Sequence, residues 1–248
     1  MPSLRTLLTD LSPPTNGNAK QIFYVANYSN SNQNGGCCLL WTVPQGITSV
    51  TFELWGAGGD GPGARCCEFG GIGPNSGSYA IRTVDTAAGC QYRICAGGSG
   101  CEGCCCGIST RGLPSFIYDV SAGGNIACGC GGEGGNNDIT RGGYRAYTCC
   151  WARIGECGYG DFGMPGTGSV TFRNQFCESN QYDIIAGGWT SSRMTPDMCA
   201  GQIARAGTDL MQSCPSFPAG AGTGGRAYSD GRCHGQHGAA GLVKISYN

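Results

Sequence analysis

Charged side chains are scarce in this sequence. Asp, Glu, Lys and Arg make up 12% of its 248 residues, and the formal net charge is −1. A protein that binds nucleic acid through its phosphates needs a basic patch, and this charge balance gives no sign of one. Disordered chains are rich in charge and poor in aromatic residues, whereas 9% of this chain is aromatic. The composition therefore predicts a folded protein that does not bind nucleic acid.

Long apolar runs are also missing. No run approaches the roughly 20 residues that a membrane-spanning helix needs, so we expect no membrane insertion. In residues 1–15 the apolar pair Leu7-Leu8 is soon followed by Asp10 and Pro13, which makes this segment too short and too polar for a signal-peptide core. We therefore expect a protein that is made in the cytoplasm without a secretion signal.

Signatures of catalysis are equally sparse. The chain has 2 histidines and no G-x-S-x-G motif, and its carboxylates are scattered, so we expect neither an enzyme nor a bound cofactor. Residues 56–61 match the dinucleotide-binding pattern G-x-G-x-x-G. However, Pro62-Gly63 stands where the helix that faces the pyrophosphate would have to begin. We interpret this match as a coincidence.

Glycine and cysteine are present in excess, with 47 and 19 residues respectively. The glycines have no Gly-X-Y period, which excludes a collagen. Ala-Gly-Gly follows an apolar, strand-like run each time it occurs, at residues 57–59, 96–98, 122–124 and 186–188. We therefore expect strands that lead into glycine-rich excursions at residues 58–77, 97–112, 123–168 and 187–241.

Two structures are open to these excursions. They could be flexible loops, or extended threefold helices of the polyglycine-II type that pack backbone against backbone. Flexible linkers contain glycine and serine and little else, whereas these excursions also contain Tyr, Trp, Ile, Arg and Cys. We favour the packed arrangement.

Apolar alternation predicts several strands. Val50, Phe52 and Leu54 alternate with Thr51 and Glu53, which is the pattern of a strand with one buried face. Similar runs lie at residues 21–25, 78–84, 91–95, 115–120, 169–173, 183–186 and 242–247. The one candidate helix, at residues 197–212, is weakened by its glycines. We predict an all-β fold, a small, cysteine-rich antiparallel β-sandwich with glycine-rich, polyglycine-II-like excursions.

The sequence suggests one main domain. Residues 36–248 are predicted to form the glycine-rich β domain. Residues 1–35 are rich in Ser and Asn near their end and contain no cysteine, which favours an N-terminal arm that attaches the protein to something else. The strand-like run at 21–25 fits an extra edge strand of the same domain equally well.

Cysteines gather in and beside the excursions. Their odd number leaves at least one thiol outside intrachain bridges. Disulfides would stabilise loops that lack a core by roughly 2–4 kcal/mol each in the loop-entropy model. The pairs Cys101-x-x-Cys104 and Cys128-x-Cys130 leave a zinc site open, and reduced thiols acting as small apolar groups are a third alternative. We favour disulfides without a metal, and assign a structural role to Cys66, Cys67, Cys101, Cys104, Cys105, Cys106, Cys128, Cys130, Cys149 and Cys150.

Aromatic and arginine side chains crowd two of the excursions. Such residues are favoured at contact surfaces because they bring large contact areas with few rotatable bonds. They could instead only cover the glycine-rich backbone. The predicted residues for receptor or subunit contact are Tyr144, Tyr147, Trp151, Tyr159, Trp189, Arg145 and Arg153.

Five motifs follow one another in a fixed order: WTVPQGITSVTFELWGAGG at 41–59, GSYA at 77–80, QYRI with AGG at 91–98, GLPSF with AGG at 112–124, and GAAGLVKISY at 238–247. This series resembles the glycine-rich domain of bacteriophage tail fibres and related virion proteins. The resemblance covers about residues 36–130 and 238–248. Cysteines such as Cys66 and Cys101 stand where that family usually has glycine or polar residues.

The resemblance implies a β-sandwich with projecting polyglycine helices, in a part of the virion that often contacts the host. We therefore expect a bacteriophage virion structural protein, made in the host cytoplasm and released by lysis. It would be a tail-fibre or tail-tip component that mediates host attachment, attached through residues 1–35; the alternative is a capsid decoration protein that stabilises the head. The expected partners are other virion proteins and a host surface glycan or outer-membrane receptor, and the resemblance implies a trimer.

Overall fold

The computed structural model describes residues 20–26, 37–61, 74–98, 110–135, 158–166, 171–172, 184–185, 217–220 and 237–247. Within these residues the only regular secondary structure is the β-strand. The candidate helix at 197–212 lies outside them.

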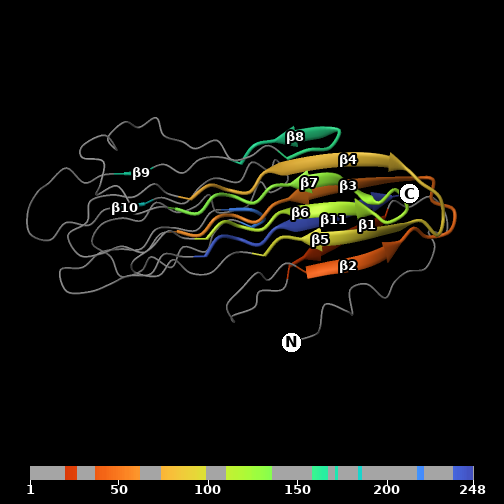
Figure 1. Ribbon diagram of the computed structural model, residues 1–248, viewed down its shortest axis with the longest axis horizontal. Helices are drawn as coiled ribbons and strands as arrows, with labels where there is room; N and C mark the ends of the chain where they lie inside the picture. The colour runs from red at the N-terminus through yellow and green to blue at the C-terminus, as the bar shows by residue number, and fades with distance from the viewer. Residues whose placement is uncertain are drawn as a thin grey trace, which may run out of the picture.

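The strands form two main antiparallel sheets (Figure 1). The larger sheet has the order β1-β11-β3-β4-β8, with β1 (Lys20–Val25), β3 (Ser49–Trp55), β4 (Tyr79–Asp85), β8 (Phe162–Met164) and β11 (Leu242–Tyr247). The smaller sheet has the order β2-β5-β6-β7, with β2 (Cys37–Thr42), β5 (Gln91–Ala96), β6 (Ser115–Asp119) and β7 (Gly124–Gly129). A separate pair consists of β9 (Thr171–Phe172) and β10 (Ile184–Ile185). The predicted all-β, antiparallel fold is confirmed.

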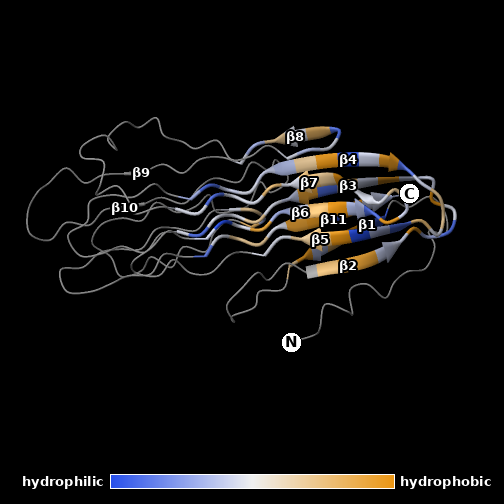
Figure 2. Cartoon of the chain, in the orientation of Figure 1, coloured by the Kyte–Doolittle hydropathy of each residue, from blue (hydrophilic) through white to orange (hydrophobic). Residues whose placement is uncertain are grey.

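The two main sheets share one side-chain core. Phe52 and Leu54 from β3 and Ile94 from β5 are fully buried in the same cluster, as is Ile117 from β6. Trp41 belongs to the same cluster and lies edge-to-face with Phe52, at 6.2 Å between ring centroids. Because alternate residues of a strand point to opposite faces, the predicted inward set of β3 is the set that meets the other sheet. Figure 2 shows the result as apolar colour concentrated in the strands.

The outer face of β3 is buried as well toward the end of the strand, at Glu53 and Trp55. Trp55 follows Leu54 and therefore points away from the shared core, yet it is only 1% exposed. It lies in a second, smaller cluster with Ala219 and Leu242, on the outer face of the larger sheet. The segment 217–220 covers this end of the sheet, so a residue on the outer face is buried as well.

The excursion predicted at 123–168 is partly wrong, because it contains two strands. β7 pairs with β6 as a hairpin, and β8 pairs with β4. The Ala-Gly-Gly at 122–124 is the turn of that hairpin, where Gly123 has a φ of +73° and Gly124 begins β7. A positive φ is a conformation that glycine adopts without steric cost.

The strand run at 21–25 is confirmed as β1, which pairs with β11. Tyr24 is buried in the shared core. The larger sheet therefore includes part of the segment 1–35, as the edge-strand alternative expected.

Candidate functional site

Glycine-rich segments leave the strands at one end of the sandwich and run side by side (Figure 1). They are residues 56–61 after β3, 74–78 before β4, 97–98 after β5, 110–114 before β6, 130–135 after β7 and 237–241 before β11. We call this set, together with 217–220, the glycine bundle.

Hydrogen bonds within the glycine bundle repeat every third residue. The N–H groups of Gly56 and Gly59 donate to Ser78 and Asn75, both at 3.0 Å. The N–H groups of the residues that follow each of them, Ala57 and Asp60, donate instead to Leu113 (3.0 Å) and Thr110 (3.1 Å). In a β-ladder the direction of the backbone groups alternates with a period of two. With a period of three, the N–H groups of successive residues donate to different neighbouring segments.

Residues 56–61 are bonded on further sides as well. Gly132 and Gly135 donate to the carbonyl groups of Ala57 and Asp60, again three residues apart, at 2.8 and 2.9 Å. Gly58 donates to the carbonyl of Ala239 at 2.9 Å. The segment is thus enclosed by main chains from distant parts of the sequence, which satisfies backbone groups that would be costly to bury unpaired.

Glycine is required where these main chains meet. A Cβ atom on Gly131 would overlap the carbonyl oxygen of Gly112, and one on Gly58 would overlap that of Gly220. Since the overlapping atoms belong to the backbone, no rotation of a side chain could relieve the contact. The bundle therefore owes its close spacing to the missing side chains.

Asp60 connects several segments of the bundle. Its carboxylate is fully buried and accepts hydrogen bonds from the N–H of Gly238 (2.8 Å) and the hydroxyl of Thr110 (2.5 Å). The Nδ1 atom of His237 lies 3.7 Å from the same carboxylate. Burial raises the pKa of Asp60, against the lowering effect of these neighbours.

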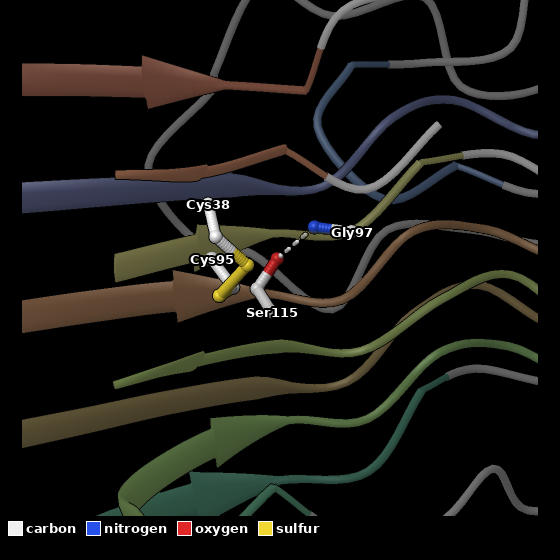
Figure 3. The surroundings of a disulfide bond; sticks show 4 residues. All are labelled: Cys38, Cys95, Gly97 and Ser115. Carbon is white, nitrogen blue, oxygen red and sulfur yellow. Dashed lines mark hydrogen bonds between the residues drawn. A yellow bond between two sulfur atoms is a disulfide. The ribbon is translucent and has the colours of Figure 1, made fainter. Parts of the chain in front are cut away.

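Ser115, the first residue of β6, connects β3 with the segment after β5 at the base of the bundle. Its hydroxyl oxygen accepts the N–H of Gly97 at 2.9 Å and its hydroxyl donates to the carbonyl of Trp55 at 2.6 Å. Figure 3 shows Ser115 beside a disulfide between Cys38 and Cys95, which joins β2 to β5 close to where β5 ends. Both features hold the strands together where the glycine-rich segments begin.

The cysteines are used in more than one way. Cys38 and Cys95 form a disulfide although neither was among the predicted structural cysteines. Cys90 is a free thiol that packs against the core, in the manner of a small apolar side chain. Cys128 and Cys130 lie in and just after β7 and are half-buried. The other cysteines that were predicted to be structural lie outside the described residues: Cys66, Cys67, Cys101, Cys104, Cys105, Cys106, Cys149 and Cys150.

Of the predicted contact residues, the structure describes Tyr159. Its backbone pairs with Cys128 through two hydrogen bonds, at 2.9 and 3.0 Å, while its side chain is 47% exposed. Phe162 nearby on β8 is also exposed. The remaining predicted residues lie outside the described residues: Tyr144, Tyr147, Trp151, Trp189, Arg145 and Arg153.

Sequence reasoning missed the Asp60 cluster. Asp60 entered the sequence analysis only within the G-x-G-x-x-G match at residues 56–61, and His237 only as one of the 2 histidines. The structure places Gly56, Gly58 and Gly59 against backbone carbonyl groups of other segments, which leaves no room there for a pyrophosphate. The available signal was a single acidic residue in a glycine-rich run. If such a run packs, its buried carboxylate needs hydrogen-bond donors from neighbouring segments.

No family model and no curated protein matches this chain. Across the part of the chain that the structure describes, no group of His, Cys, Asp or Glu has the makings of a metal site. In the same part, no helix is long and apolar enough to span a membrane.

Proposed function

We propose that this chain is a structural protein of a bacteriophage virion, a tail-fibre or tail-tip component that mediates attachment to the host. The observation that carries the proposal is the three-residue repeat of hydrogen bonds in the glycine bundle. An attachment surface must keep its shape, and glycine-rich chain normally does not, because glycine loses more conformational entropy on ordering than any other residue. Bonds to several neighbouring main chains supply the rigidity that such a surface needs.

We further propose that the glycine-rich excursions continue the bundle as threefold helices of the polyglycine-II type. Such helices have about three residues per turn and no internal hydrogen bonds, so all their backbone groups are available to neighbours. The repeat between Gly56 and Gly59, and between Gly132 and Gly135, supports this geometry. Aromatic and arginine residues of the excursions would then be held on a firm support, to contact a host glycan or an outer-membrane receptor.

Hydrogen exchange tests the rigid support. The amides of Ala57, Gly77 and Gly132 should exchange far more slowly than those of an unstructured chain, because each donates to a carbonyl of another segment. The exposed hairpin turn provides an internal reference, because the N–H groups of Ser121 and Ala122 donate there to the carboxylate of Asp119 and not to another segment. Exchange in the bundle at random-coil rates would remove the physical basis of the proposal.

Labelled antibodies against the protein, imaged on intact particles, test the location. We expect label at the tail; label confined to the head would instead favour a capsid decoration protein. Purified protein should also bind host cells, and the double variant Tyr147→Ala/Trp151→Ala should weaken that binding by about tenfold or more. The control variant Phe23→Ala removes an exposed aromatic ring from β1 and should bind as the unmodified protein does.

A further inference from the structure

The two main sheets end in edge strands, and most of these edges are protected against pairing with another chain. On β7, Cys128 exchanges backbone hydrogen bonds with Tyr159. β8 has only 3 residues and is flanked by the ion pair between Arg82 and Asp161. β1 begins with Lys20. Short strands, covered edges and lysine are the devices that natural sheets use against unwanted pairing.

The edge strand β2 has none of these devices. Its sequence, CCLLWT, contains no charge and no proline, and it spans 6 residues. Within the described residues, β2 pairs with β5 on one side and with no strand on the other. An uncharged edge of this length is a template for a further strand.

Two hydrogen bonds establish which backbone groups lie on the open edge. Val43 donates to Cys90 at 2.9 Å, so Val43 and every second residue before it face β5. Val120 donates to the carbonyl of Gln91 at 3.1 Å, which shows that Gln91, the partner of Thr42, faces β6 instead. The N–H and C=O groups of Cys38, Leu40 and Thr42 therefore point away from the sheet.

The side chains of these residues are exposed too. Cys38, Leu40 and Thr42 lie on the outer face of the smaller sheet, opposite to the core residues Leu39 and Trp41. Leu40 is 53% exposed, among the most exposed large apolar side chains of the described residues. An apolar side chain thus lies at the middle of the open edge.

We propose that β2 pairs with β2 of a second copy of this chain, antiparallel and centred on Leu40. The twofold axis places Leu40 against its own copy and Cys38 against Thr42 of the other copy, so the outward backbone groups of each strand bond to those of the other. The absence of charge favours a second copy as the occupant, because no like charges would meet when the strand pairs with itself. The smaller sheets of both copies then join into one continuous sheet.

This pairing makes a dimer, in contrast to the trimer that the family resemblance implies. It is independent of the proposed role in host attachment, because it rests on the edge of the sandwich and uses no residue of the glycine bundle. The twofold arrangement also leaves the bundle of each copy free to project from its own sandwich.

Sedimentation equilibrium of the unmodified protein and of Leu40→Lys tests the interface. We expect a reversible dimer that Leu40→Lys weakens about a hundredfold, because two lysines would then face each other across the axis. Phe162→Lys is the matched control. Phe162 is 54% exposed, but it lies on β8, an edge strand of the larger sheet, whereas β2 is an edge strand of the smaller sheet. This control should leave the dimer unchanged.

A second variant and a residue-level measurement complete the test. Thr42→Pro removes an N–H that points outward, so it should abolish the dimer while leaving the pairing of β2 with β5 intact. The amides of Cys38, Leu40 and Thr42 should exchange slowly in the dimer and fast in Leu40→Lys, while the amide of Trp41 stays protected in both. A monomer at all concentrations would overturn the proposal. This holds whether the amides of the β2 edge exchange fast or exchange slowly because another segment of the same chain covers them. A dimer that survives both variants would overturn it as well.

Discussion

The sandwich and the glycine bundle fill their interiors with different parts of the chain. Between the sheets, large side chains such as Phe52 and Ile94 occupy the space and exclude water. In the bundle the main chains themselves occupy it, at positions such as Gly58 and Gly131 where a Cβ would overlap a carbonyl group. The sandwich gains stability from apolar area, whereas the bundle gains it from satisfied backbone groups at close range. Their responses to substitution should differ accordingly.

The largest effect is expected in the sandwich. Phe52→Ala removes a fully buried ring from the centre of the core and should lower the free energy of unfolding by about 3–5 kcal/mol. Urea denaturation measures the loss, and amide exchange shows whether the bundle loses protection at the same time. If the bundle stayed protected while the sandwich unfolded, the two regions would be independent units.

The second-largest effect on stability is expected from the disulfide at the border of the two regions. Cys38 and Cys95 are 57 residues apart in sequence, so their bridge closes a long loop in the unfolded chain. Replacing both by alanine should cost about 2–4 kcal/mol. Thermal unfolding of the double variant, compared with the unmodified protein with and without reductant, checks this. If reductant does not lower the unfolding temperature of the variant, this bridge accounts for the sensitivity of the protein to reduction. If reductant still lowers it strongly, other cysteines are responsible for that sensitivity.

A methyl group added inside the bundle tests the close packing directly. Gly131→Ala forces the backbones apart and should destabilise the protein by about 1–3 kcal/mol. The control Gly124→Ala adds the same methyl at a position where nothing lies within 4 Å of it, and should change stability by less than about 0.5 kcal/mol. Equal effects of the two variants would mean that the bundle is not closely packed.

The smallest effect concerns Asp60 and depends on pH. Because burial raises its pKa in the folded state, the folded protein holds the proton more tightly, and stability falls as the pH rises above the ordinary value of 3.8. Asp60→Asn keeps an oxygen to accept from Gly238 but removes the charge, so its stability should depend less on pH in this range. Thermal unfolding between about pH 4 and pH 7 measures the difference. A steeper fall in the variant than in the unmodified protein would contradict the effect of burial.

Two copies of one tripeptide show where prediction from sequence stops. Ala-Gly-Gly at 57–59 enters the bundle, where Gly58 has no room for a side chain. The same letters at 122–124 form a hairpin turn, where Gly123 is needed for its positive φ and Gly124 has open space around it. Both copies follow a strand-like run, so local pattern alone could not separate them. The hairpin was decided by the pairing of β6 with β7.

The sequence by itself determined the strands with strong alternation and therefore the all-β class, because the period of two is carried by residues that are neighbours in the chain. Only the tertiary structure decided which glycines are enclosed, which cysteine meets Cys38, and that Asp60 is buried beside His237. Those contacts join residues far apart in sequence, and their identity depends on the register of strands and on the order in which the segments pack. A change of register by one residue would exchange the two faces of a strand without changing the pattern that predicted it.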